Sequence, residues 1–384
     1  MSWPMVKLAE VCDIQMGSAP KGSSYTELSE GIPLVAGASD YGELYPLPKK
    51  ATTEPTQVCQ TGDLIICVRA TIGDLNWADK PYCLGRGVAG LRSKAQLDSN
   101  YLFYFIRANE HVLYDNSTGS TFPQINKKTI ENLLVPLPPV AVQKSIAEKL
   151  KKAEMLVKSS LQMESELNIL AQAVFLEMFG DPLINSKGWN TKKLRDLGEL
   201  NRGKSKHRPR NDPILLGGPY PLIQTGDIAR ADNYIVNYKS TYSAFGLKQS
   251  KLWPKGTLCI TIAANIADTA ILSFEACFPD SVVGFNADVN LTSNEFIHYW
   301  LKFYQSTLEQ LAPESAQKNI NLKILEEIDV FVPPLTHQLQ FVAILNAVEK
   351  RKKEVRRQNE YLHECFDALM QRAFFGKLDL KKVA

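Results

Sequence analysis

The sequence predicts an α+β fold with two similar globular domains in tandem, separated by two long helices that pair as an antiparallel coiled coil. Three features of the 384 residues lead to this fold class. The chain repeats itself with a period of about 190 residues, which is the length of a domain and not of a solenoid repeat. Each repeat begins with a mixture of strand-like and helix-like segments. Each ends in a long segment with an apolar seam that recurs about every 3.5 residues.

The repeat is clearest where each globular part ends. A Pro-Pro pair precedes a helical segment in both copies, and a Gln follows the second proline by four residues. These residues are Pro138, Pro139 and Gln143 in the first copy and Pro333, Pro334 and Gln338 in the second. Near the start of each copy, Trp3, Leu8 and Gly17 align with Trp189, Leu194 and Gly203. The alignment predicts globular domains at 1–137 and 183–332, a central helical region at 138–182, and a C-terminal helical region with its tail at 333–384.

The globular parts contain both kinds of secondary structure. The aligned segments DLIICVRAT and TLCITIAAN are short, β-rich and bounded by Gly and charged residues, which predicts strands. The segments SNYLFYFIRANEHVL and SNEFIHYWLKFYQSTL carry apolar residues at helical spacing after a Ser-Asn pair. This pattern predicts helices that are capped by those two residues.

The two helical regions carry seams that step by fours and threes. The seam positions are Ile146, Leu150, Ala153, Val157, Ser160, Glu164, Leu167, Ala171, Val174 and Met178, and then Phe341, Leu345, Val348, Lys352, Val355, Asn359, Leu362, Phe366, Leu369 and Ala373. Both seams turn polar near the middle, so antiparallel pairing would bring Ser160 and Glu164 together with Lys352 and Asn359 in one central layer. The alternative is that two unrelated amphipathic helices each lie on their own domain.

The two helical regions are also expected to differ in length. Counted from the proline pairs, Gln371 lies four residues further along its region than the similarly placed Gln172. This difference predicts one extra helical turn in the second region, because a turn takes about 3.6 residues.

Composition narrows the class of protein. The formal net charge of +3 does not by itself indicate nucleic-acid binding. No run of 18 apolar residues is present, and the N-terminal segment lacks a basic start followed by an apolar core, so we expect neither a membrane span nor secretion. The seven cysteines include no Cys-x-x-Cys pair, which suits reduced thiols in the cytoplasm better than disulfides or a zinc site.

The sequence contains only incomplete motifs for catalysis, metals or cofactors. GRGVAG at 85–90 fits the dinucleotide template, but the next segment predicts a strand and turn where the template requires a helix. The histidines show no metal-ligand spacing and are expected on the surface or satisfied in the core; they are His111, His207, His298, His337 and His363. Neither an Asp/Asn-Pro-Pro-Tyr stretch for adenine methylation nor a Gly-Lys-Ser/Thr loop for a triphosphate is present. We therefore expect no catalysis, no metal and no cofactor on this chain.

NRGKSKHRPRND at 201–212 is a candidate DNA-contacting segment. It is dense in cations that bind phosphate and guanine, although it can also be interpreted as a solvated, partly disordered loop. The equivalent loop of the first copy, MGSAPKGSSY, has only Lys21. One scaffold with two loop chemistries is what a reader of two different DNA sequences would show.

Other aligned positions differ in the same way. They pair Ser39 and Asp40 with Gly226 and Asp227, Arg69 and Thr71 with Ala263 and Asn265, and Ser120, Thr121 and Gln124 with Ser315, Gln317 and Asn319. Arg can grip guanine, Asn and Gln can grip adenine, and Asp can accept from cytosine. The predicted DNA-binding residues are Ser18, Lys21, Ser39, Arg69, Thr71, Arg86, Ser120, Thr121, Gln124, Arg202, Lys204, Lys206, His207, Arg208, Arg210, Thr225, Asp227, Asn265, Gln317, Lys318 and Asn319.

These residues and their order resemble a known family. The features that carry this resemblance are the two Pro-Pro-x-x-x-Gln entries, FGDP at 179–182, AFFGKL ending the second helix, and GSTFPQINKKTIENLLVPLPP at 119–139. Together they look like the specificity subunit of a bacterial or archaeal type I restriction-modification enzyme. The resemblance implies two target-recognition domains related by pseudo-two-fold symmetry. Each would read one half of a bipartite, asymmetric site in double-stranded DNA, with paired helices setting the spacer.

The resemblance also implies partners. Two methyltransferase subunits would dock along the helices and bring S-adenosylmethionine, and ATP-dependent translocase-nuclease subunits with magnesium would join for cleavage in phage defence. Two alternatives remain open at this point. The chain could serve a methylation-only or other phage-defence complex, or it could be a protein-protein scaffold that does not bind DNA.

Overall fold

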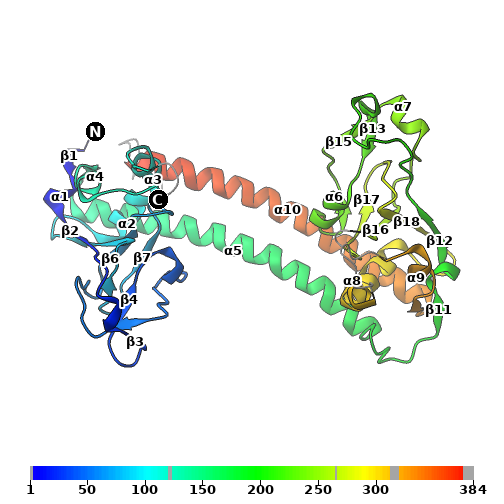
Figure 1. Ribbon diagram of the computed structural model, residues 1–384, viewed down its shortest axis with the longest axis horizontal. Helices are drawn as coiled ribbons and strands as arrows, with labels where there is room; N and C mark the ends of the chain where they lie inside the picture. Colours follow the sequence, from blue (N-terminus) through cyan, green and yellow to red (C-terminus); the bar gives the residue numbers. More distant parts are fainter. Residues whose placement is uncertain (1–2, 120–122, 264–265, 312–319, 375–384) are drawn as a thin grey trace. The chain divides into compact units, whose positions relative to one another are not determined.

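A computed structural model describes residues 3–119, 123–263, 266–311 and 320–374. It divides into two compact units (Figure 1). The first unit comprises Met1–Gln162 with Arg356–Ala384, and the second comprises Met163–Val355. Each unit contains one globular domain and parts of two long helices, α5 (Val140–Phe179) and α10 (Leu335–Phe374).

The globular domain of the first unit is built on a four-stranded sheet with the strand order β2-β9-β6-β7. A second sheet has the order β3-β5-β4-β8, and β1 pairs with β10. The strands are β1 (Met5–Lys7), β2 (Cys12–Met16), β3 (Tyr25–Thr26), β4 (Ile32–Val35), β5 (Ala51–Thr52), β6 (Leu64–Cys67), β7 (Leu75–Trp77), β8 (Cys83–Leu84), β9 (Val88–Ser93) and β10 (Leu134–Pro136). The helices are α1 (Leu8–Val11), α2 (Ser99–Ala108), α3 (Glu110–Asp115) and α4 (Lys127–Glu131), with 3-10 turns at Gly22–Ser24 and Ala38–Asp40.

The second unit repeats this plan with a five-stranded sheet in the order β12-β18-β16-β17-β14. β13 pairs with β15, and β11 pairs with β19 as β1 does with β10. The strands are β11 (Thr191–Lys193), β12 (Gly198–Arg202), β13 (Leu216–Leu222), β14 (Tyr234–Ile235), β15 (Ser240–Tyr242), β16 (Leu258–Thr261), β17 (Thr269–Leu272), β18 (Val282–Ala287) and β19 (Asp329–Phe331). The helices are α6 (Thr225–Arg230), α7 (Ala244–Lys248), α8 (Asn294–Leu311) and α9 (Leu322–Glu326), with 3-10 turns at Leu194–Asp196 and Pro213–Leu215.

Most of the local predictions are confirmed. DLIICVRAT and TLCITIAAN supply β6 and β16, whose residues are all buried because both strands lie inside their sheets. β9 begins within GRGVAG, at Val88, and continues to Ser93, so no helix opens where a dinucleotide would need one. The predicted Ser-Asn cap is correct for α8, where the Ser293 hydroxyl accepts from the amide of Phe296 at 3.1 Å. It is wrong for α2, because Asp98, one residue earlier, accepts from the amide of Tyr101 at 3.0 Å.

The long helices run antiparallel, as their packing within each unit shows. In the first unit, the beginning of α5 and the end of α10 share one core, which includes Ile146 and Leu150 from α5 and Phe374 from α10. In the second unit, the end of α5 and the beginning of α10 share another, which includes Phe175 and Phe341. Each helix therefore pairs with the other, as predicted. Each also packs on a globular domain, which is the part of the alternative that holds.

Two predictions about the helices concern their lengths and their polar seam residues. α5 and α10 both begin directly after the second proline, and α5 ends at Phe179. α10 is described as far as Phe374, and the residues that follow lie outside the described part of the chain, so the extra turn stays a prediction. Lys352 does not complete a polar layer with α5. Its buried ammonium group donates to Asp232 of the globular domain and, at 3.1 Å, to Glu349 one turn earlier.

The Pro-Pro-x-x-x-Gln entry has a structural role in both units. Gln143 is fully buried; its amide group donates to the carbonyls of Gln96 (2.9 Å) and Pro138 (2.8 Å) and accepts from the amide of Asp98 (2.8 Å). Gln338 makes the equivalent contacts in the second unit. Its amide group donates to the carbonyls of Leu291 and Pro333 and accepts from the Thr292 hydroxyl at 2.8 Å. Each glutamine therefore ties the first turn of a long helix to the loop that enters α2 or α8.

Candidate nucleic-acid interface

At the aligned glycines Gly17 and Gly203, two backbone segments pass close to each other in the same way in both domains. The amide of Gly17 donates to Val88 at 3.0 Å, and that of Gly203 donates to Val282 at 2.8 Å. A Cβ atom on either glycine would come within 2.3 Å of a backbone oxygen. Only glycine lets the loop that follows β2 or β12 cross so close to the segment that enters β9 or β18.

In the first unit this crossing gathers two predicted residues. The amide of Ser18 donates to the carbonyl of Leu84 at 2.9 Å, which places Ser18 beside the turn that carries Arg86. Arg86 is exposed, and its guanidinium has no hydrogen-bond or ion-pair partner among the described residues.

Two further predicted residues lie on the segments next to this turn. The amide of Val68 donates to Gly87 at 2.8 Å, so Arg69 follows a strand that is bonded to the Arg86 turn. Gln124 forms a β-bridge with Arg69, and both side chains are exposed. The structure therefore places four predicted residues on neighbouring segments that are hydrogen-bonded to one another at one edge of the domain. These residues are Ser18, Arg86, Arg69 and Gln124.

The remaining predicted residues of the first unit are less closely grouped. Ser39 is exposed on the 3-10 turn Ala38–Asp40. The carbonyl of Ala36, two residues before this turn, accepts from the amide of Gly87 at 3.0 Å, which also places the turn near Arg86. Thr71 is exposed in the β6–β7 turn, and Lys21 is exposed before the turn Gly22–Ser24. Ser120 and Thr121 lie outside the described residues.

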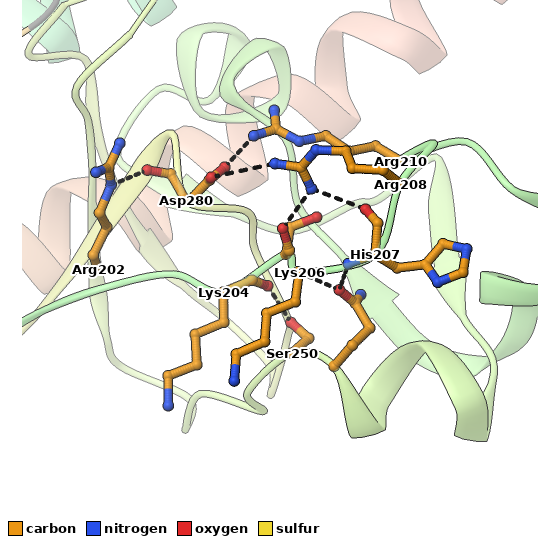
Figure 2. A network of polar contacts seen from close by, with 10 residues as sticks. Arg202, Lys204, Lys206, His207, Arg208, Arg210, Ser250 and Asp280 are labelled. Atoms are coloured by element: carbon orange, nitrogen blue, oxygen red, sulfur yellow. Dashed lines mark hydrogen bonds and ion pairs between the residues drawn. The ribbon is translucent and has the colours of Figure 1, made fainter.

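In the second unit, the arginines of the 201–212 segment converge on Asp280 (Figure 2). Its backbone oxygen accepts from Nε of Arg202, and its carboxylate accepts from Arg210 and lies 3.8 Å from Arg208. Arg208 also donates to the carbonyl of Ser205 at 2.7 Å. The segment is therefore held in place by polar contacts, unlike a solvated, partly disordered loop.

Other contacts fix the backbone of this segment. Gln249 accepts from the amides of Lys206 (2.6 Å) and His207 (3.1 Å), and Ser250 donates to the carbonyl of Lys204 at 2.9 Å. Both lysine side chains are exposed and extend away from Asp280 (Figure 2). Within the described residues, neither ammonium group has a hydrogen-bond or ion-pair partner.

His207 is engaged within the same segment. Its Nε2 lies 2.9 Å from the Asp212 carboxylate, and this hydrogen bond lowers the pKa of Asp212. Its ring also packs edge-on against Phe245, with the centroids 6.0 Å apart. These contacts give His207 a role in closing the loop, whereas Lys204 and Lys206 project freely.

A hollow of about 330 Å³ adjoins the arginines. It is lined by Arg202, Arg210, Ile262, Ala263, Asp280, Ser281, Ile320 and Asn321. Arg202 and Arg210 therefore meet at one site, together with Ala263, the position aligned with Arg69. The predicted residues Asn265, Gln317, Lys318 and Asn319 lie outside the described residues.

Asp227 and Thr225 lie at the beginning of α6. The carboxylate of Asp227 accepts from the amide of Gln224 at 2.9 Å and from Arg230 at 2.7 Å, so it is used by its own helix. The aligned Asp40 accepts from the amide of Ala36 at 2.8 Å in the same manner. A contact of either carboxylate with cytosine stays a prediction.

Sequence reasoning missed Asp280, Ser281 and Asn321. Asp280 precedes Val282 by two residues, as Arg86 precedes Val88, and these valines accept from the aligned glycines Gly203 and Gly17. Comparing the turn of the second copy with that of the first would have revealed an aspartate in the place of an arginine.

Comparisons with known proteins agree with this duplicated plan. The model of the type I restriction modification DNA specificity domain matches residues 2–167 and again residues 186–360. The chain belongs to this family. The specificity subunit MjaX of Methanocaldococcus jannaschii is 37% identical over 158 residues, which are 40% of this chain and 37% of that protein. The EcoBI specificity subunit of Escherichia coli is 23% identical, and the match covers 98% of this chain and 86% of that one.

A solved type I specificity subunit from M. genitalium has the same fold, with a TM-score of 0.60 at 14% identity over 97% of this chain and 96% of that chain. The predicted α+β class, the two recognition domains in tandem and the family resemblance are thereby confirmed. Specificity subunits are the DNA-recognition part of their enzymes and not the catalytic part.

Among the residues that the structure describes, no group of three or more His, Cys, Asp or Glu could hold a metal ion. His298 is fully buried and bonded to Thr269 and Asn233, and burial lowers its pKa, so it is a satisfied core residue. Burial also raises the pKa of Cys12 to about 12 and that of Cys59 to about 11, which leaves both thiols protonated. None of the described helices is long and apolar enough to cross a membrane.

Proposed function

We propose that each globular domain reads one half of a bipartite, asymmetric site in double-stranded DNA. The main support for this proposal is that the two domains share one fold but expose different side chains at the aligned edges. The first domain exposes Arg69, Arg86 and Gln124 at the edge marked by Gly17, and the second presents Arg202 and a basic loop at the edge marked by Gly203. Two different sets of donors and acceptors on the same scaffold suit two different base sequences.

The direct test is single-molecule methylome sequencing of the source strain with and without this gene. We expect a bipartite motif with a fixed gap, present only when the gene is intact. Binding of the complex to duplex DNA should also weaken steeply with salt, because phosphate contacts release counterions. A methylome that does not change when the gene is removed would contradict the proposal, and salt-independent binding would favour a protein-protein scaffold.

Partners supply the chemistry in this proposal. Two methyltransferase subunits would bring S-adenosylmethionine, and translocase-nuclease subunits would bring ATP and magnesium for cleavage in the cytoplasm. In support, one solved structure with a similar fold concerns complex assembly and conformational transition of the type I R-M system. Co-purification from native cells tests the composition: a translocase-nuclease indicates restriction, and methyltransferase alone indicates a methylation-only system.

The outward side of α5 supports docking. Its exposed apolar side chains include Met155 and Leu156 in the first unit and Met163, Ile169 and Leu170 in the second. The exposed side of α10 is mainly charged; its residues include Lys350, Arg351, Lys353, Glu354, Arg357 and Glu360. Exposed apolar side chains on one helix are typical of a surface that another protein covers.

We expect Ile169→Glu to reduce the methyltransferase that co-purifies by about tenfold or more, because a carboxylate would be buried in an apolar contact. Ile169 is 63% exposed, so the fold should persist. Gln358→Glu on the exposed side of α10 adds the same charge and serves as the control. Equal yields of partner from both variants would place the docking surface elsewhere.

We also propose that helix length sets the gap between the half-sites. Inserting four residues after the exposed Ser159 adds about 6 Å and rotates the helix by about 40°. The spacer should lengthen by one or two base pairs, at about 3.4 Å each, while both half-sites stay the same. Methylome sequencing of the insertion strain provides the test; an active enzyme with the original spacer would show that α5 does not set it.

A further inference from the structure

Asp280 and Arg86 occupy the same place in the common frame and carry opposite charges. Arg86 lies in the turn before β9 and Asp280 in the turn before β18, which are the last strands of their sheets in sequence. Each turn lies beside the close backbone approach made by Gly17 or Gly203. In the first domain the turn offers an exposed arginine. In the second the turn offers a carboxylate, and the arginines come from the loop that crosses beside it (Figure 2).

The contacts of Asp280 divide the basic loop into two groups. Arg202 donates to its backbone oxygen, Arg210 donates to its carboxylate, and Arg208 lies 3.8 Å from the other carboxylate oxygen. Lys204 and Lys206 extend away from it. The Asp280 side chain is 34% exposed, so water and DNA can reach this cluster.

Two physical effects follow from this arrangement. A carboxylate holds guanidinium groups by charge-assisted hydrogen bonds, which reduces the number of rotamers that these long side chains sample before DNA arrives. It also offsets part of their positive charge, which weakens attraction to any phosphate regardless of sequence. Both effects favour the correct sequence over all others.

We propose that the Asp280 carboxylate is a positioning group for DNA reading by the second domain: it orients Arg210, which donates a hydrogen bond to it, and it offsets the charge of Arg210 and Arg208, which suppresses their nonspecific binding to phosphate. This inference rests on the proposed function of that domain. It assigns discrimination to an acidic residue that need not contact a base itself.

The test uses Asp280→Asn in the complex with the methyltransferase partner. For binding to a 30-base-pair duplex of random sequence, we expect affinity to rise about three- to tenfold near 0.1 M salt, with a steeper salt dependence by about one counterion. In methylome sequencing, the half-site read by the second domain should become degenerate at one or more positions. The other half-site should not change.

Asp196→Asn is the matched control. Asp196 is exposed beside Arg195 in the same unit, so the variant gains the same charge away from the loop. We expect it to keep the wild-type motif and to raise random-duplex binding less than Asp280→Asn does.

The possible results distinguish failure of the proposed role of Asp280 from failure of the proposed DNA reading. If Asp280→Asn keeps the wild-type motif and the wild-type binding to the random duplex, the inference is wrong while the function stands. If the variant loses methylation, stronger and more salt-dependent binding to the random duplex still supports the inference, and weaker binding overturns it. If the wild-type complex shows neither a bipartite motif nor salt-dependent binding, the proposed function itself fails.

Discussion

Replacement of residues 1–137 by the matching region of a relative is expected to change one half-site of the methylated sequence completely and to leave the other intact. The first domain has its own sheets and one core cluster made only of its own residues, and β1 and β10 pair within the exchanged region. Arg69, Arg86 and Gln124 all lie in that region, whereas the basic loop around Asp280 lies in the second unit. Methylome sequencing of the strain with the hybrid gene gives the result directly.

The graft needs a matched surface toward the long helices. Tyr101 and Phe105 pack on Phe374 of α10, with ring centroids 5.1 and 5.7 Å apart, and Tyr104 donates to Glu154 of α5 at 2.8 Å. Keeping the three aromatic residues in the grafted domain preserves these contacts. The reciprocal exchange of 183–332 serves as the control and should change the opposite half-site. A simultaneous change of both half-sites by either hybrid would contradict independent readout.

Phe175→Ala is expected to destabilise the protein more than any surface substitution. Phe175 is fully buried, and its ring lies within 5.6 Å of the rings of Phe179, Phe296 and Phe341. One side chain thus joins α5, α8 and α10 within the second unit. Its removal leaves a cavity and should lower the free energy of unfolding by about 3–5 kcal/mol.

Thermal and denaturant unfolding of the purified chain measure this loss. Leu176→Ala at the next position is the control, because Leu176 is 38% exposed and should cost less than about 1 kcal/mol. Similar losses for both variants would mean that the aromatic cluster does not hold the helices to the second domain.

The repeated pattern was sufficient to predict the α+β class, the tandem domains and both long helices. β6 and β16 were predictable because short β-rich runs between turn residues depend on local chemistry. The helices were predictable because a seam over many turns reports its own period. The contacts made by Gln143 and Gln338 were not predictable, because their partners lie 45 to 47 residues away in the sequence.

For the interface, the sequence by itself determined which residue types are available and that the two copies differ. The tertiary structure decided which of them meet. It placed Arg69 beside Gln124 through a β-bridge and brought Arg202, Arg208 and Arg210 to Asp280, which is 70 or more residues away. It also turned Lys352 toward Asp232 instead of a polar layer with α5. The physical reason is that propensity and periodicity act over a few neighbouring residues, whereas the partner of a charged side chain is set by how distant segments pack.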